Sequence, residues 1–315
     1  MTHTTSTTFP PSEVRAAAAA LAAGAFAQSA GRGQIVLPSG AAGDLGRLWP
    51  PMALTRWLPR TPLVRVLAGH AGAGASTVTL ALADAAATQM PVRVLDAACP
   101  TWSTLAAATS TELGTTEPGT TEQGTTGPGA TEPGARGGWR RGRRGDRMLI
   151  ERLAAPAPSP DRVPVPAPVE AGAIPAALTV LDVGWSAREV AGHPHGWLVS
   201  TPAVEVAVTR YKAAAFAQVE AHLEARLQAQ LQAGGAPPTL LVVIGAKRWS
   251  GAEFSCAGPR LSRLRESAVF MPLVGSRDAG IGPGPLPRPL MSAARRLLEA
   301  LIDLTGPLTI SKGSP

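Results

Sequence analysis

A glycine-rich turn between a short apolar strand and a helix constrains this chain more than any other feature of its sequence. Residues 63–68, LVRVLA, predict a buried strand, and residues 69–77 continue as GHAGAGAST. No helix breaker interrupts residues 76–89, and residues 92–96, VRVLD, predict a second short strand. Strand, glycine loop, helix and strand form a βαβ unit, which implies a parallel sheet with right-handed crossovers.

The second half of the chain repeats this alternation of apolar runs and amphipathic segments. Apolar runs bounded by turn residues predict buried strands, and segments with apolar residues every three to four positions predict helices. The sequence therefore predicts one doubly wound, mostly parallel α/β domain over residues 61–315. The further strands are predicted at residues 178–183, 196–200, 239–244 and 268–272, and the further helices at residues 211–233 and 289–304.

Three segments precede or interrupt this domain. Residues 1–60 are rich in Thr, Pro and Ala and predict a mobile leader with one helix at residues 12–28. Between residues 111 and 147 the pentads GTTEP, GTTEQ, GTTGP and GATEP contain nothing apolar to bury, which predicts a disordered insert. Residues 148–153 predict an edge strand, and the Pro- and Ala-rich residues 154–175 predict a second linker.

Composition excludes several classes of protein. Two cysteines in 315 residues cannot form a disulfide framework, which favours a cytoplasmic protein. The apolar stretch at residues 16–27 is shorter than the roughly 20 residues that a membrane-spanning helix needs, so no membrane span is predicted. The net charge of +7 permits contact with nucleic acid without identifying it.

Much of the positive charge lies in one arginine-rich segment directly after the repeats. A tryptophan lies within it, and a single aspartate opposes it. Such a segment predicts a flexible arm that neutralises DNA phosphates. A solvated boundary beside the acidic repeats is an equal alternative, and both stay open at this point. The arginines are Arg136, Arg140, Arg141, Arg143, Arg144 and Arg147.

The glycine loop has the composition of a phosphate-binding loop, with one change. Such a loop needs glycines so that backbone N–H groups converge on an anion, a helix behind them, a lysine and a hydroxyl for Mg²⁺. Here four residues separate Gly69 from Gly74, and Ser76 supplies the hydroxyl. The lysine position holds Ala75. A tight turn without a ligand is the alternative interpretation.

A dinucleotide-binding site is a further alternative. Gly72 and Gly74 open a helix, and Asp96 ends the next strand about twenty residues later, where an acid that binds ribose belongs. The third glycine position of that motif holds Thr77, however, and the loop is longer than a Rossmann turn. These departures favour the phosphate-binding loop.

Five passages together resemble the ParA/MinD-type ATPases, whose Walker A motif is deviant. They are LVRVLAGHAGAGASTVTLALADAAA, VRVLDAACP, LTVLDVGWS, LLVVIGAKRW and VFMPLVGSRDAGIGPGPLP. The similarity is greatest to divergent actinobacterial members, which often occur on plasmids and integrative elements, and it covers most of residues 62–305 by order of elements. It implies a three-layer αβα fold of the P-loop NTPase type. The family loop reads Lys-Gly-Gly-x-Gly-Lys-Thr-Thr, and the aligned residues 70–77 lack both lysines, which makes this a degenerate P-loop.

The resemblance also implies roles for particular residues. Loop N–H groups would hold phosphates, and Asp182 resembles the Walker B carboxylate that holds Mg²⁺ through water. Asp96 resembles the first acid after the second strand, whereas the second acid position holds Ala98 or, with a shift of one residue, Cys99. The implied nucleotide-binding residues are Gly69, Gly72, Gly74, Ala75, Ser76, Thr77, Asp96 and Asp182, and the implied Mg²⁺ ligands are Ser76 and Asp182.

The base of the nucleotide has its own expected contacts. Residues 272–278 look like the loop that lies over adenine in this family. The asparagine expected after the preceding strand is absent from residues 245–248, GAKR. Lys247 or Arg248 contacts a nucleotide in one interpretation and is a solvated loop charge in the other.

The missing lysines predict weak or absent binding of ATP and Mg²⁺. Losing one charge-assisted phosphate contact costs about 1.5–3 kcal/mol, and losing one preorganised donor slows phosphoryl transfer by a factor on the order of 10² to 10³. We therefore expect at most a weak ATPase. The resemblance implies a regulatory or scaffolding role in plasmid partition or conjugative transfer, with partition or transfer proteins as partners and a second copy of the chain in a homodimer.

Two hypotheses of other classes stay open. One is an active ATPase whose cation comes from a partner subunit. The other is a nucleotide-independent DNA-binding protein that uses the arginine-rich segment.

Overall fold

The computed structural model describes most of the predicted α/β domain. Within the described residues, no helix is long and apolar enough to cross a membrane. The helix predicted at residues 12–28 lies outside them, as does Arg136. The described residues are 57, 59, 61–116, 138–167, 176–186, 189–190, 192–193, 196–201, 203–233, 238–249, 257–274 and 281–305.

Strands and helices alternate along the described chain. The strands are β1 (Leu63–Ala68), β2 (Val92–Asp96), β3 (Thr111–Thr116), β4 (Trp139–Arg144), β5 (Met148–Leu153), β6 (Leu178–Ser186), β7 (Val204–Arg210), β8 (Thr239–Ile244) and β9 (Val269–Met271). The α-helices are α3 (Ala75–Ala87), α5 (Trp197–Ser200), α6 (Ala213–Ala233), α8 (Pro259–Arg263) and α9 (Arg288–Thr305), and short 3₁₀ helices cover Thr104–Ala108 and Pro160–Arg162.

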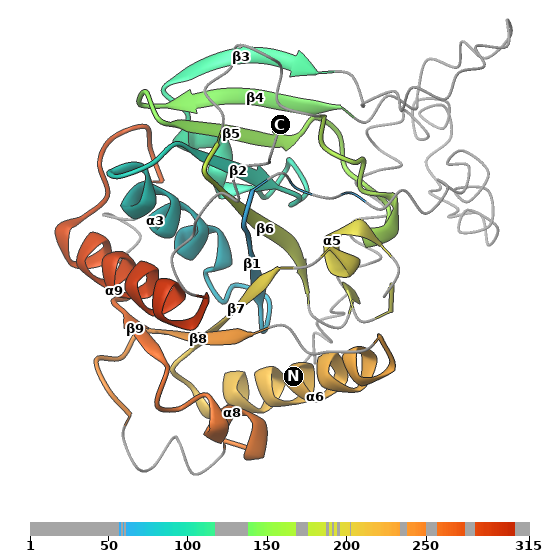
Figure 1. Cartoon of the computed structure of the whole chain (residues 1–315), viewed down its shortest axis with the longest axis vertical. Coiled ribbons are helices and arrows are strands. Elements are labelled where there is room, and N and C mark those ends of the chain that lie inside the picture. The colour runs from blue at the N-terminus through green and yellow to red at the C-terminus, as the bar shows by residue number, and fades with distance from the viewer. Residues whose placement is uncertain are drawn as a thin grey trace, which may run out of the picture.

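The strands form a single nine-stranded sheet in the order β3-β4-β5-β2-β6-β1-β7-β8-β9 (Figure 1). All neighbours from β5 to β9 run parallel, and β4 pairs antiparallel with β5 and β3. From β1 the chain passes first to β2 on one side of the sheet and later to β7, β8 and β9 on the other. The predicted doubly wound, mostly parallel α/β fold is confirmed.

Helices cover both faces of the sheet because successive strand residues point to opposite sides. Val64 and Val66 of β1 belong to the core that α3 and α9 cover, and these two helices lie side by side (Figure 1). Leu63 and Leu67 belong to a second core on the opposite face, together with α5. Further along this opposite face, α6 and α8 pack on β7 and β8. The result is a three-layer αβα arrangement.

One central strand escaped the sequence analysis. Residues 204–210 form β7, which pairs with β1 on one side and β8 on the other. The predicted strand at residues 196–200 is wrong, because residues 197–200 form the single-turn helix α5. Trp197 and Leu198 are buried all the same, since α5 packs on the second core.

The predicted insert at residues 111–147 is ordered at both ends. Residues 111–116 form β3 and residues 139–144 form β4, so β5 is an inner strand and not the predicted edge strand. Residues 117–137 lie outside the described residues. The prediction of a flexible arginine arm is therefore wrong for β4, where the arginines are part of a sheet.

The predicted linker at residues 154–175 also differs, as far as the structure describes it. Ala157 and Val163 are buried in the second core. The indole Nε1 of Trp197 donates to the carbonyl of Val163 at 2.8 Å. Residues 154–167 thus cover one face of the sheet instead of leaving it.

A buried ion network lies between β1, β7 and α6. The Arg65 Nη1 donates to Glu205 Oε1 at 2.7 Å, and both side chains are almost fully buried. From α6, Arg226 donates to the same carboxylate oxygen. Burial alone would raise the pKa of Glu205, but the charges of Arg65 and Arg226 hold it below its usual range. This network fixes α6 against the two strands that flank the glycine loop.

We predict that Glu205→Gln lowers the free energy of unfolding by about 3–5 kcal/mol, because it leaves two guanidinium groups buried without a counter-charge. Denaturant unfolding of the two proteins measures the change. Glu224→Gln is the matched control, since Glu224 pairs with Arg260 at the surface, where water screens the pair and a much smaller loss is expected. Equal losses of unfolding free energy in the two variants would show that Glu205 is not the counter-charge of a buried ion network.

Candidate phosphate-binding site

Two glycines with positive φ shape the loop between β1 and α3. Gly72 has a φ of 71° and Gly74 a φ of 98°, and Gly74 is the N-cap of α3. A Cβ on Gly74 would lie 2.7 Å from Cδ1 of Ile244. The positive φ therefore favours glycine at this position, and the loop lies in close contact with the Ile244 side chain at the end of β8.

The first turn of α3 leaves backbone donors available at this loop. The Ala73 amide donates to the His70 carbonyl at 3.1 Å, and the Val78 amide donates to the Gly74 carbonyl at 3.0 Å. The amides of residues 74–77 lie between these two. Among the described residues none of the four donates to a backbone carbonyl, as at the start of any helix. The partial positive charge of a helix N-terminus gathers at these donors, so the loop can bind an anion.

Two buried carboxyl groups lie at the ends of neighbouring strands. Asp96 of β2 and Asp182 of β6 are directly opposite each other in the parallel pair, and neither is exposed to solvent. Asp96 accepts hydrogen bonds from the Ala98 amide at 3.0 Å and from the Ser103 hydroxyl. Asp182 Oδ1 accepts from the Gly184 amide at 3.1 Å. Its Oδ2 is buried without a hydrogen-bond partner in the described part of the chain.

Burial is the main reason that both carboxyl groups hold protons more tightly than usual. The pKa of Asp96 is raised to about 7, first by burial and then by the negative charge of Asp182, while Arg152 acts in the opposite direction. Burial raises the pKa of Asp182 to about 6, although the nearby Ser76 hydroxyl favours the charged form. No hydrogen bond of normal geometry joins Ser76 to Oδ2, so this oxygen remains available to a cation.

The segment after β2 packs directly on the end of β6. A Cβ on Gly184, whose φ is 67°, would lie only 2.3 Å from Cα of Ala98. Cys99 is buried, and its Sγ lies 3.1 Å from Oγ1 of Thr101. The position of the second family acid is therefore taken by small or uncharged side chains that pack against the backbone.

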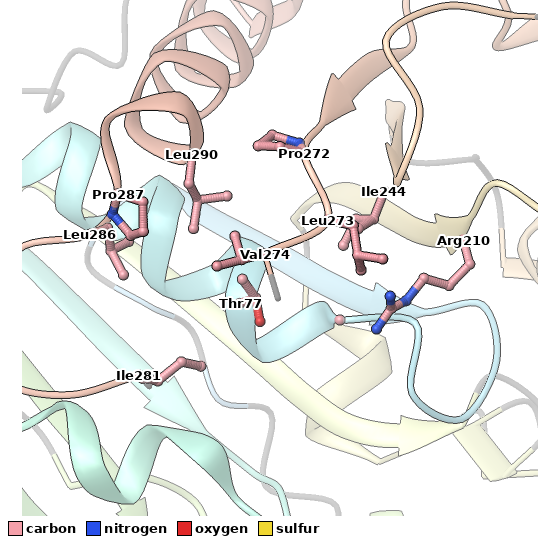
Figure 2. A pocket seen from close by; sticks show the side chains of 11 residues that line it. Thr77, Arg210, Ile244, Pro272, Leu273, Val274, Ile281, Leu286, Pro287 and Leu290 are labelled. Atoms are coloured by element: carbon pink, nitrogen blue, oxygen red, sulfur yellow. The ribbon is translucent and has the colours of Figure 1, made fainter. Parts of the chain in front are cut away.

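An apolar cavity of about 130 Å³ opens on one side of the loop. Gly74 and Thr77 form one wall, and the segment after β9 forms another with Pro272, Leu273 and Val274 (Figure 2). These three residues begin the segment predicted to lie over adenine, whereas residues 275–278 lie outside the described residues. The structure thus places an apolar hollow next to the loop between β1 and α3, bordered by the start of the segment predicted to lie over adenine.

A larger cavity of about 580 Å³ also borders this loop and shares Arg210, Ile244 and Leu273 with the apolar cavity. His70, Ala71 and Gly72 line it from the loop, and Arg210 and Lys212 line it from the end of β7. Lys247 and Arg248 are exposed and line neither cavity. The cations near the loop therefore come from β7 and not from the segment after β8.

Two arginines of the arginine-rich segment contribute to internal structure. Arg144 is buried and donates to both carboxylate oxygens of Asp84 on α3, at 2.8 and 2.9 Å. It also donates to the carbonyls of Gly282 and Gly284, which belong to the segment bordering the apolar cavity. Arg141 donates to the buried Glu151 at 2.7 Å. The remaining described arginines of the segment, Arg140, Arg143 and Arg147, are exposed.

The sequence analysis missed Arg210. The signal was present as VEVAVTR, a run rich in β-branched residues that ends in a cation. The predicted strand at residues 196–200 obscured it, because two strands so close together leave no room for a crossover helix. Among the described residues, no group of three or more His, Cys, Asp or Glu side chains could hold a metal ion.

Comparisons with known proteins find similarity in structure only. No protein-family model matches the sequence, and no curated protein matches it. The MinC:MinD cell division complex of Aquifex aeolicus has 13% identity and a TM-score of 0.44, covering 76% of this chain and 96% of that one. MinD of Pyrococcus horikoshii OT3 with Mg-ADP has 15% identity and a TM-score of 0.44, covering 78% and 98%. A ParA family ATPase of Chlorobium tepidum TLS has 10% identity and a TM-score of 0.40, covering 77% and 98%.

Similarity at this level concerns the course of the chain and assigns no role to any residue.

We predict that Asp182→Asn makes the stability of the chain less sensitive to pH. A carboxyl whose pKa is raised on folding stabilises the folded state while protonated, and this contribution is lost as pH rises from about 4 toward the folded values of about 6 and 7. Between pH 5 and 8 the free energy of unfolding of the variant should therefore fall by on the order of 2 kcal/mol less than that of the wild type.

Denaturant unfolding at several pH values measures this difference. His222, whose pKa burial lowers to about 4, titrates in the opposite sense, but it is present in both proteins and cancels in the comparison. If the free energy of unfolding depended on pH in the same way in the two proteins, the pKa of Asp182 would not be raised on folding.

Proposed function

We propose that this chain is a nucleotide-binding protein of the ParA/MinD type, which holds a nucleoside triphosphate and Mg²⁺ at the loop between β1 and α3. One observation carries the proposal. The free amides at the start of α3 and the unpartnered Oδ2 of Asp182 lie at the same edge of the sheet, with the Ser76 hydroxyl beside the carboxylate. Amides bind anions and hard oxygen donors bind Mg²⁺, so the two halves of the site match a Mg²⁺–phosphate group.

Each residue then has a defined task. The amides of Gly74, Ala75 and Ser76 hold phosphate oxygens, and the hydroxyl of Ser76 and the Asp182 carboxylate hold Mg²⁺. The buried oxygen of Asp182 fits this task, because without a cation it gives up solvation and gains no hydrogen bond. When bound, Mg²⁺ would supply neutralisation of the phosphate charge.

Hydrolysis is the weaker half of the proposed activity. Ala75 offers no ammonium group to the phosphates, and the segment after β2 contains no second acid close to Asp96. The raised pKa of Asp96 leaves it largely protonated below neutral pH, where it cannot accept a proton from water. These features favour a protein that responds to bound nucleotide over a fast ATPase.

The biological process proposed here rests on the resemblance of the sequence to the ParA/MinD-type ATPases. A nucleotide-dependent regulator or scaffold fits plasmid partition or conjugative transfer, and a homodimer and partition or transfer proteins are its expected partners. The DNA-binding alternative keeps only the exposed Arg140, Arg143 and Arg147 among the described arginines of β4 and its turn. Arg140 and Arg143 point to opposite sides of the strand, so the sheet does not present the three as one surface.

Calorimetry of ATP binding with and without Mg²⁺ tests the proposal. We expect dissociation constants of about 10 μM to 1 mM for the wild type, since one lost phosphate contact costs about 1.5–3 kcal/mol, and tighter binding with Mg²⁺. Asp182→Asn should abolish the gain from Mg²⁺ and leave metal-free binding nearly unchanged. Ser262→Ala, an exposed position on α8, is the control. A wild type that binds no nucleotide under either condition would overturn the proposal.

A further inference from the structure

The end of β7 delivers one cation directly to the phosphate loop. β7 pairs with β1 so that Val208 lies opposite Ala68, and the Gly69 amide donates to the Val208 carbonyl at 2.9 Å. Two residues further along, Arg210 therefore comes level with His70, where its own amide donates to His70 Nε2 at 3.2 Å. The register of two central strands, and not a flexible loop, sets the position of Arg210.

The Arg210 side chain turns onto the loop itself. Its Nε donates to the carbonyl of Gly72 at 3.1 Å. This bond holds the guanidinium beside the positive-φ turn, and Figure 2 shows the Arg210 side chain directed toward the loop that enters the helix carrying Thr77. One edge of the guanidinium is thus fixed by the backbone, and its Nη groups remain as donors.

Arg210 differs from the arginines of the protein interior in having no carboxylate partner. Arg65, Arg141 and Arg144 each form an ion pair with a buried or half-buried acid. Within the described residues, no acid forms an ion pair with Arg210 or with the neighbouring Lys212. The hydrogen bond of Arg210 to Gly72 lies at the surface, so the guanidinium is accessible to an anionic ligand, which would supply a counter-charge.

Arg210 also lies where the two cavities meet. It lines the apolar cavity next to Gly74 and the larger cavity that His70 and Lys212 border. A ligand with an apolar ring in the first cavity and a charged chain along the loop must pass the guanidinium. A guanidinium can bind a phosphate group through two parallel hydrogen bonds.

We propose that Arg210 is the phosphate-binding cation of this site and replaces, from β7, the lysine that is absent at Ala75. The ligand class is a nucleoside triphosphate, with its triphosphate against Arg210 and the loop amides and its base in the apolar cavity. This inference rests on the proposed function. It differs from the hypothesis of a cation supplied by a partner subunit, because the charge is already held within the chain.

Binding of ATP, AMP and tripolyphosphate to the full-length chain and to Arg210→Ala tests the inference. We expect Arg210→Ala to weaken ATP and tripolyphosphate binding by about 10- to 100-fold, the value of one charge-assisted contact. AMP should bind with a change of less than about threefold, since its single phosphate lies nearer the base. Arg210→Lys should recover part of the loss because it restores the charge. Lys247→Ala, an exposed cation that lines neither cavity, is the matched control.

The outcomes separate the two claims. A wild type that binds none of the three ligands overturns the proposed function, and this inference with it. A wild type that binds ATP while Arg210→Ala binds it equally well overturns the inference alone. An equal loss of affinity for AMP and ATP, without recovery in Arg210→Lys, also overturns it, because Arg210 would then act only by supporting the shape of the loop.

Discussion

The parallel register of β1 with its two neighbours is the interaction on which the site depends. Val66 of β1 lies opposite Asp182 of β6, and Asp182 lies opposite Asp96 of β2. Because parallel strands end at the same edge, this pairing brings both acids to the loop that leaves β1. Both acids share a strand face with valines of the core beneath α3, so a slip of one residue would turn them to the opposite layer.

Close backbone packing at this edge complements the register. Gly74 approaches Ile244 of β8, and Gly184 approaches Ala98 after β2. A Cβ at Gly184 would push apart the two backbone segments that follow Asp96 and Asp182. The acids remain buried because no side chain separates these segments, and that burial raises the pKa of each carboxyl. The close packing of these segments therefore accounts both for the tight fit of the site and for the raised pKa of its two carboxyl groups.

The sequence predicted the parts of the fold that depend on local pattern. The apolar runs of β1, β2, β6 and β8 and the long helices α3, α6 and α9 were found to within a few residues, because each is uninterrupted. β4 was missed because its arginines predict solvation, whereas Glu151 on the adjacent strand β5 and Asp84 on α3 neutralise Arg141 and Arg144. The role of Arg210 could not be predicted either, since it depends on the register between β7 and β1.

A cation on β7 would act differently from a lysine on α3. A lysine at residue 75 would start on the helix whose amides bind the phosphates, and its ammonium could follow charge as it develops during transfer. Arg210 is instead held by the Gly72 carbonyl, so it would meet a bound triphosphate and any transition state with nearly the same geometry. Uniform binding of this kind increases affinity without accelerating the chemical step. A phosphate loop built in this way would retain the ability to sense nucleotide while hydrolysing it slowly.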